Sequence, residues 1–325
     1  MEKIIQNFLA DGKGILAADE SNKTAGKRLD AIGLENTEEN RRAFRDLFLS
    51  TEGIENYLSG VILYDETIRQ TNPNGTLFTD ALKEKGIEIG IKVDMSTTPL
   101  PGFPEEVMTQ GLDGLGERLS EYKDMGATFT KWRAVFRIGE GIPTKECIHA
   151  NALDMARYVA FVQEAGMVPI VEPEVLLDGD HTIEESAETI EEVVSHTFYE
   201  IKRMRGDISK TILKTSMALP GSKNEKAKPE EVAKSTLSAL LASVPKEVPG
   251  VVFLSGGQTS EEASLNLATI VSEGKRVGAP WKLTFSFARA LQEEPLSTWG
   301  GKLENVETAR KVLEDVLVRN TKAIS

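Results

Sequence analysis

Eight short apolar segments recur along this chain, and stretches with helical patterning or polar loops separate them. Strands that are hydrophobic almost throughout, in such an alternation, are typical of a parallel sheet covered by helices. Eight units predict an α/β fold of the (β/α)8 or TIM-barrel type, with a doubly wound open sheet as the alternative. The predicted strands cover residues 14–19, 60–65, 87–94, 128–137, 168–174, 211–217, 250–257 and 281–287.

Amphipathic helices are predicted between these strands and at both ends of the chain. We expect the helix over 1–11 and the C-terminal helix over 302–322 to pack outside the barrel. A polar, lysine-rich turn is predicted after the first strand, and a long loop over 95–116. No linker or repeat divides the sequence, so residues 1–325 are interpreted as one barrel domain. The apolar stripe of the C-terminal helix consists of Leu303, Val306, Leu313, Val316 and Leu317. Further helices are predicted over residues 37–58, 147–165 and 229–243. Three more are predicted: one ends near Gly126, one ends near Met204, and one begins at residue 259.

The composition excludes several classes of function. A formal net charge of −13 and a pI near 5.0 argue against nucleic acid as a partner, because binding to phosphate backbones needs a basic surface. The single cysteine, Cys147, permits no internal disulfide, which suits a reducing compartment. The N-terminus is too polar for a signal peptide, and no apolar run approaches the ~18 residues of a membrane span. We therefore expect a cytoplasmic protein that binds no membrane.

Charged residues gather at the ends of the predicted strands, which is where TIM barrels build their active sites. Residues two apart in a strand share a face. The alternating apolar residues Ile91, Val93, Trp132 and Val171 should therefore face the outer helices. Convergence of so many charges favours an active site over ordinary solvated strand ends. The charged residues are Asp19, Lys92, Asp94, Lys131, Arg133, Glu172 and Glu174.

Lys214 lies in the middle of the sixth predicted strand, 211–217, with the sequence TILKTSM. Burial of an unpartnered ammonium is unfavourable, so this side chain either snorkels to water or serves as an uncharged nucleophile. In the second interpretation, desolvation and the cation of Lys131 lower the pKa of the amine, and Glu172 shuttles protons. The amine attacks a carbonyl to form a Schiff base, and Asp19 is the candidate partner for substrate hydroxyls. This is aldol chemistry, and it needs no metal.

Two segments have the residues of phosphate sites. Gly256 and Gly257 stand between a strand and a helix, where backbone N–H groups can hold an anion, although a tight turn is an equally common reason for such glycines. Ser286 and Arg289 follow the eighth strand, beside the usual phosphate position of the fold. A second candidate anion site follows the first strand and consists of Ser21, Thr24, Lys27 and Arg28.

The histidines indicate no metal site. His149 and His196 lie in helical stretches, where packed or solvated histidines are common. His181 follows Asp178 and Asp180 in the sequence DGDH, which is expected to be a loop that caps the next helix. Three scattered histidines argue against a zinc enzyme, so we expect no metal.

Together, these segments resemble the class I, Schiff-base fructose-1,6-bisphosphate aldolases. The matching motifs include GKGILAADES, NTEENRR, GVILYDETI, GIKVD, KWR, VPIVEPE, DGDH, FLSGGQ and WGGK, and they cover nearly the whole chain. The resemblance implies a (β/α)8 barrel, commonly tetrameric. It also implies reversible cleavage of fructose 1,6-bisphosphate to dihydroxyacetone phosphate and glyceraldehyde 3-phosphate, in glycolysis and its reverse, without a cofactor.

The resemblance also implies roles for individual residues. Lys214 matches the Schiff-base lysine, Glu172 the acid/base carboxylate, Lys131 its charged neighbour and Asp19 the aspartate at the substrate hydroxyls. Ser255, Gly256 and Arg289 match the site of the ketose 1-phosphate, and Ser21, Thr24, Arg28 and Lys92 match the region of the 6-phosphate. We place Glu174 with the catalytic group, and Arg133, Gly257 and Ser286 with the groups that bind the substrate and its phosphates.

The sequence departs from the animal members of this family at several points. Thr24 replaces a serine, LKTSM replaces LKPNM, and Ala288 replaces a glycine whose loss is expected to crowd the phosphate loop. The animal enzymes use a C-terminal tyrosine for one proton transfer, whereas no tyrosine follows Tyr199 here, so we expect that step to use another base. The alternatives are a Schiff-base aldolase for another phosphorylated ketose, such as tagatose 1,6-bisphosphate or fructose 1-phosphate, and a binding or scaffold protein that has lost catalysis.

Overall fold

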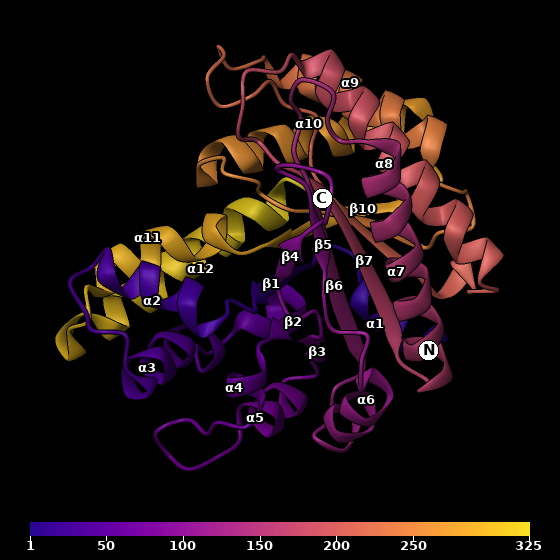
Figure 1. Cartoon of the computed structure of the whole chain (residues 1–325). Helices are drawn as coiled ribbons and strands as arrows, with labels where there is room; N and C mark the ends of the chain where they lie inside the picture. The colour runs from indigo at the N-terminus through magenta and orange to yellow at the C-terminus, as the bar shows by residue number, and fades with distance from the viewer.

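Eight parallel strands form a closed barrel in the computed structural model, which describes residues 1–325 (Figure 1). Neighbours follow the order β1-β10-β9-β8-β7-β6-β3-β2, so β8 and β2 stand on opposite sides of the barrel. This confirms the predicted fold class. The strands are β1 (Gly14–Ala18), β2 (Leu58–Leu63), β3 (Glu88–Lys92), β6 (Phe129–Phe136), β7 (Val168–Val175), β8 (Ile212–Thr215), β9 (Gly250–Phe253) and β10 (Lys282–Phe287).

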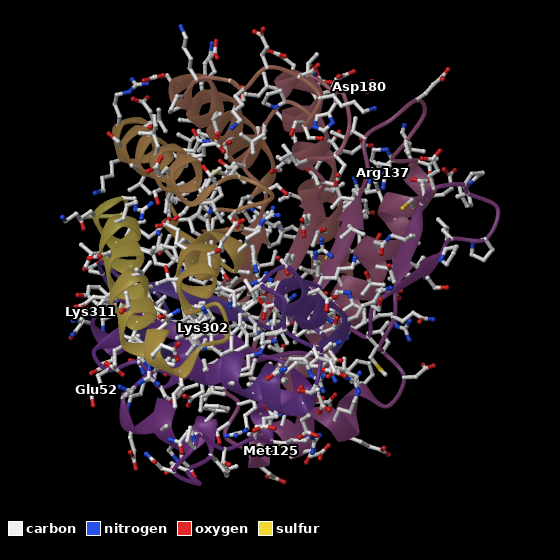
Figure 2. All side chains as sticks on the ribbon, turned by 90° about the vertical axis from the view of Figure 1, so that its left-hand side faces the viewer. Glu52, Met125, Arg137, Asp180, Lys302 and Lys311 are labelled. Atoms are coloured by element: carbon white, nitrogen blue, oxygen red, sulfur yellow. The ribbon has the colours of Figure 1, made fainter.

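Helices surround the barrel, with α2, α3, α11 and α12 gathered on one side and α7 and α8 on another (Figure 1). Loops at the carboxyl ends of strands include Arg137 and Asp180, and Figure 2 places both well away from Glu52 and Met125, which precede strands. No helix combines the length and apolar character needed to cross a bilayer. The helices are α1 (Glu2–Phe8), α2 (Asn22–Asp30), α3 (Glu38–Leu49), α4 (Asp65–Ile68), α5 (Phe78–Glu84), α6 (Leu115–Asp124), α7 (Lys145–Glu164), α8 (Ile183–Arg203), α9 (Pro229–Ser243), α10 (Ser260–Val277), α11 (Arg289–Trp299) and α12 (Val306–Lys322).

The core has two parts, which follow from the alternation of side chains along the strands. A large outer cluster fills the space between strands and helices and includes Ile91, Val93, Trp132 and Val171, as predicted. A smaller cluster fills the barrel interior, and α1 closes its lower end, where the Phe8 ring packs edge-on against Phe129 at 4.7 Å. The interior below the mouth is therefore apolar. Its buried members are Ile5, Phe8, Ile15, Ala17, Ile62, Phe129, Val168, Ile170, Ile212 and Val252.

Several local predictions were wrong. The segment after β1 is helix α2, not a turn, because Ser21 caps it and Ala25 and Leu29 supply a narrow buried stripe in an otherwise polar sequence. The predicted helix over 37–58 ends at Leu49, because a left-handed turn at Gly53 (φ 78°) leads into a short 3-10 turn and then β2.

The long loop over 95–116 contains an antiparallel hairpin of β4 (Thr97–Pro99) and β5 (Val107–Thr109). At the C-terminus, Leu313, Val316 and Leu317 of α12 are buried, but Leu303 is 87% exposed. Leu303 lies in a 3-10 turn before the helix and is therefore out of register with the apolar stripe. The outer side of α12 carries Lys311 at the edge of the molecule (Figure 2).

Candidate active site

A cavity of about 870 Å³ opens at the carboxyl ends of the strands, at the barrel mouth. Except for Lys27, the structure brings to it every residue that was singled out as catalytic or binding. Residues from distant parts of the sequence meet there because the barrel is closed and each strand ends at the same rim. The predicted residues that line it are Asp19, Ser21, Thr24, Arg28, Lys92, Lys131, Arg133, Glu172, Glu174, Lys214, Ser255, Gly256, Gly257, Ser286 and Arg289.

Glu172 joins two lysines at the centre of this cavity. Its Oε1 lies 3.0 Å from Nζ of Lys214, and its Oε2 lies 3.0 Å from Nζ of Lys131. Lys131 also lies 2.7 Å from Oδ2 of Asp19. Lys214, Lys131 and Glu172 are 4%, 2% and 3% exposed, so Lys214 does not reach out to water as a snorkelling lysine would.

Electrostatics hold Lys131, Asp19 and Glu172 in their charged forms. Burial would lower the pKa of Lys131, but the carboxylates of Asp19, Glu172 and Asp94 outweigh it and raise that pKa. Burial would likewise raise the pKa of Asp19, yet Lys131 and Lys214 hold it well below its ordinary value. The pKa of Glu172 is lowered because Lys131 and Lys214 outweigh its burial. Glu172 is therefore a carboxylate in the free protein, ready to accept a proton before it donates one.

Asp94 belongs to the same network; it was among the charged residues expected to converge at the barrel mouth but had been assigned no catalytic or binding role. Its Oδ1 accepts a hydrogen bond from Nζ of Lys92, and its Oδ2 lies 3.9 Å from Nζ of Lys131 and 3.3 Å from the backbone N of Arg133. The i,i+2 pairing with Lys92 was the sequence signal that identified it. Farther out, Glu174 forms an ion pair with Nε of Arg133 and contacts neither Lys131 nor Lys214 as an ion pair.

The candidate phosphate site beside β9 and β10 is made of glycine backbone and a helix N-terminus. Gly256 (φ 51°) and Gly257 (φ 90°) adopt left-handed conformations that other residues rarely tolerate. A Cβ on Gly257 would lie 3.3 Å from the Arg289 guanidinium, so that cation lies against the glycine turn. The Ser286 hydroxyl is buried without a partner and lines the cavity.

The helix that presents free N–H groups to this site is α11 rather than α10. Thr259 and Glu262 form a capping box that satisfies the first turn of α10. Ala288 caps α11 without any side-chain hydrogen bond and lines the cavity, so the α11 N–H groups remain available to an anion. Ala288 has φ −105°, a value that alanine adopts without left-handed strain.

The second candidate anion site lies where α2 begins. The Ser21 Oγ accepts a hydrogen bond from the backbone N of Thr24, and Arg28 lies 2.6 Å from Glu20. Glu20 also pairs with the buried Arg45, so two guanidinium groups share one carboxylate and leave a net positive charge. Lys27 is exposed and does not line the cavity, which contradicts its predicted place in this site.

The other candidates stay outside the site. His149 is half exposed, with Nδ1 3.3 Å from Glu200, and His196 contacts the backbone O of Glu192. In the DGDH loop, Thr182 caps α8 through a capping box, so the acidic residues before it are not the caps. No group of three or more His, Cys, Asp or Glu side chains is arranged to hold a metal ion.

One wall of the cavity was missed by the sequence reasoning. Tyr64 is the residue that follows β2, and its position two after the inward-facing Ile62 was a signal that could have found it. Further side chains approach from α4 and the hairpin segment, which the sequence did not predict, and from α6, which matches the helix predicted before Gly126. They are Asp65, Arg69, Met95, Arg118, Glu121 and Tyr122.

Comparisons with known proteins agree with this geometry. A family model described as glycolytic fructose-bisphosphate aldolase class-I matches residues 1–325. The chain is 50% identical over 302 residues to cytosolic fructose-bisphosphate aldolase 4 of Arabidopsis thaliana, covering 92% of this chain and 76% of the relative. It is 49% identical over 295 residues to a probable class 1 fructose-bisphosphate aldolase of Xanthomonas campestris, covering 90% and 87%.

A solved structure of fructose-bisphosphate aldolase from Plasmodium falciparum, in complex with TRAP and a small molecule inhibitor, is similar to this chain with a TM-score of 0.95 and 44% identity. The similarity covers 99% of this chain and 93% of the other. With its closed barrel, its buried cluster of lysines and carboxylates, and a match along its whole length, the chain belongs to the class-I fructose-bisphosphate aldolase family.

Proposed function

We propose that Lys214 is the nucleophile with which this enzyme cleaves fructose 1,6-bisphosphate. The observation that supports the assignment is the buried contact of 3.0 Å between its Nζ and the Glu172 carboxylate. Glu172 accepts a proton from the Lys214 ammonium, and the neutral amine then adds to C2 of the ketose to form a carbinolamine. Glu172 returns the proton to the departing hydroxyl, water leaves, and a protonated Schiff base remains.

The iminium then withdraws electrons from the neighbouring carbon–carbon bond. Asp19 accepts the proton of the C4 hydroxyl, the C3–C4 bond breaks, and its electrons form an enamine on Lys214 while the aldehyde leaves. The enamine takes up a proton at C3 from solvent, and Asp19 releases the proton of the C4 hydroxyl to solvent. Water then hydrolyses the resulting Schiff base to release dihydroxyacetone phosphate and restore the amine. Lys131, kept protonated by three carboxylates, stabilises Asp19 and Glu172 in the ionised forms that these steps need.

Cations on both sides of the cavity favour a bisphosphate over a monophosphate. We assign the 1-phosphate to Ser255, Gly256 and Gly257 with Ser286, Arg289 and the α11 N-terminus, which lie beside β8 in the barrel order. We assign the 6-phosphate to the region of Ser21, Thr24, Arg28 and Lys92 across the mouth. Glu174 holds Arg133, which acts as a binding group at the rim. Rates on fructose 1-phosphate and tagatose 1,6-bisphosphate test this assignment, and equal rates on the mono- and bisphosphate would contradict it.

Borohydride reduction of the enzyme with dihydroxyacetone phosphate tests the nucleophile. Peptide mapping should locate the reduced adduct on Lys214, and Lys214→Met should form none. Lys210→Met is the matched control, because Lys210 precedes the same strand at its other end and pairs only with Asp207 near the surface. An adduct on another lysine, or trapping that survives in Lys214→Met, would overturn the assignment.

We further propose that the enzyme is a cytoplasmic homo-oligomer, with the tetramer as the expected state. The names of the cytosolic relatives and the resemblance to commonly tetrameric enzymes support this. Exposed apolar side chains on outer helices, such as Tyr199 and Leu265, agree with an interface. Sedimentation equilibrium checks it, and a monomer at micromolar concentration would contradict it.

A further inference from the structure

Tyr64 is an aromatic residue of the cavity to which the proposed steps assign no role, and unlike the Tyr122 hydroxyl, which donates to Asp65, its hydroxyl has no partner. It follows β2 with an extended backbone (φ −98°, ψ 158°) and stands two residues after Ile62, which points into the barrel interior. Since Ala18 pairs with Leu63 and Leu63 with Ile91, the next residues in register are Asp19, Tyr64 and Lys92. Tyr64 therefore belongs to the same layer of the mouth as two predicted site residues.

The hydroxyl of Tyr64 is available to a ligand. The side chain lines the cavity, and the hydroxyl has no hydrogen-bond partner within the protein. Burial, together with the nearby carboxylates of Asp65, Glu66 and Asp94, raises the pKa of this phenol, so it is a neutral hydrogen-bond donor at physiological pH.

The two residues after Tyr64 hold it in place. Asp65 accepts hydrogen bonds from Arg69 at 2.8 Å and from the Tyr122 hydroxyl at 2.9 Å. Glu66 accepts two hydrogen bonds from the Arg41 guanidinium, from Nε to Oε1 at 2.7 Å and from Nη2 to Oε2 at 2.6 Å. Because these contacts order the short helix α4 before any ligand arrives, a hydrogen bond from Tyr64 costs little additional entropy.

We propose that the Tyr64 hydroxyl donates a hydrogen bond to an oxygen of the aldehyde half of the substrate, carbons four to six, and so contributes to selection of the aldehyde. The inference rests on the proposed Schiff base at Lys214. That bond places C2 of the ketose at β8, and the 1-phosphate lies beside it at β9 and β10. The rest of the carbon chain must then run across the mouth toward β1, β2 and β3, where Tyr64 stands opposite β8.

Steady-state kinetics of Tyr64→Phe in the condensation direction test this role, because the variant removes only the hydroxyl. The KM for glyceraldehyde 3-phosphate should rise about tenfold, which is the loss expected for one hydrogen bond. The KM for dihydroxyacetone phosphate and the borohydride trapping of that substrate should stay unchanged. Tyr57→Phe is the matched control, since Tyr57 flanks the other end of β2, its hydroxyl lies 3.2 Å from Glu314, and its loss should change neither KM.

An unchanged KM for the aldehyde in Tyr64→Phe would overturn the inference. Equal rises in both KM values, or a lowered melting temperature, would assign Tyr64 a structural role and overturn it as well. Absence of a trapped adduct in the wild-type enzyme is a different result, because it would overturn the Schiff base and, with it, the inferred direction of the substrate chain.

Discussion

Replacement of Lys131 by methionine should destabilise the enzyme in a way that depends on pH. The substitution keeps most of the side-chain volume but removes the cation that lies 2.7 Å from Asp19 and 3.0 Å from Glu172. Removing one partner of a buried ion pair costs about 3–5 kcal/mol, because the other charge stays buried. With an unfolding entropy of about 2.1 cal/mol/K per residue, a chain of 325 residues should melt about 4–7 °C lower.

The sign of the pH dependence follows from the pKa directions. The pKa of Asp19 is lower in the folded protein than in the unfolded chain, so its contribution to stability is present at neutral pH and is lost as pH falls. The pKa of Lys131 is raised above its ordinary value of 10.5, so its contribution is complete below that pH and is lost only in strong alkali. The two contributions coexist between about pH 5 and 9, where the Lys131→Met deficit should be largest.

In Lys131→Met, the pKa values of Asp19 and Glu172 should rise toward and above their ordinary values. Below about pH 5 the folded variant then binds a proton that relieves the unpaired charge, and the difference in melting temperature from wild type should shrink. Thermal unfolding followed by fluorescence at about pH 8 and about pH 4 measures this. Lys210→Met is the control, since its exposed pair with Asp207 should shift the melting temperature by no more than about 1 °C. A deficit no larger than the control's, or one equal at both pH values, would refute the reasoning.

Three further substitutions and one treatment have defined outcomes. Glu172→Gln should slow Schiff-base formation by about 10²–10⁴-fold, measured by quenching with borohydride over time, and an unchanged rate would remove Glu172 from the proton shuttle. Gly257→Ala should raise the KM for fructose 1,6-bisphosphate and cost about 1–2 kcal/mol of stability, because φ is 90° and the new Cβ would lie 3.0 Å from Leu177. Leu303→Gln should leave the melting temperature within about 1 °C of wild type, because the side chain is 87% exposed, and a larger fall would reveal a contact made in solution. Dialysis against a chelator should leave aldol cleavage intact, and activity restored only by added metal would exclude the lysine mechanism.

The local sequence pattern was enough to predict the barrel, because short apolar segments alternate with helical stretches eight times along the chain. It failed where short polar segments acquire structure from their neighbours. Helix α2 forms because Ser21 caps it and Ala25 and Leu29 pack against the core, and the hairpin of β4 and β5 depends on pairing across a loop. Leu303 was wrongly predicted to lie on the buried stripe, because the prediction treated 302–322 as one continuous helix, whereas α12 begins three residues after Leu303.

The sequence alone determined which chemistry is possible here. A lysine within an apolar strand, with paired charges at i and i+2 on other strands, identified Lys214, Lys131 and Glu172 before any contact was known, because strand alternation assigns faces regardless of the partner strand. Only the tertiary structure decided which of these charged groups form ion pairs and how those pairs shift their pKa values. Closure of the barrel places both lysines on one carboxylate and brings Tyr64 opposite Lys214, and these distances depend on strand order and register, which connect residues far apart in the chain.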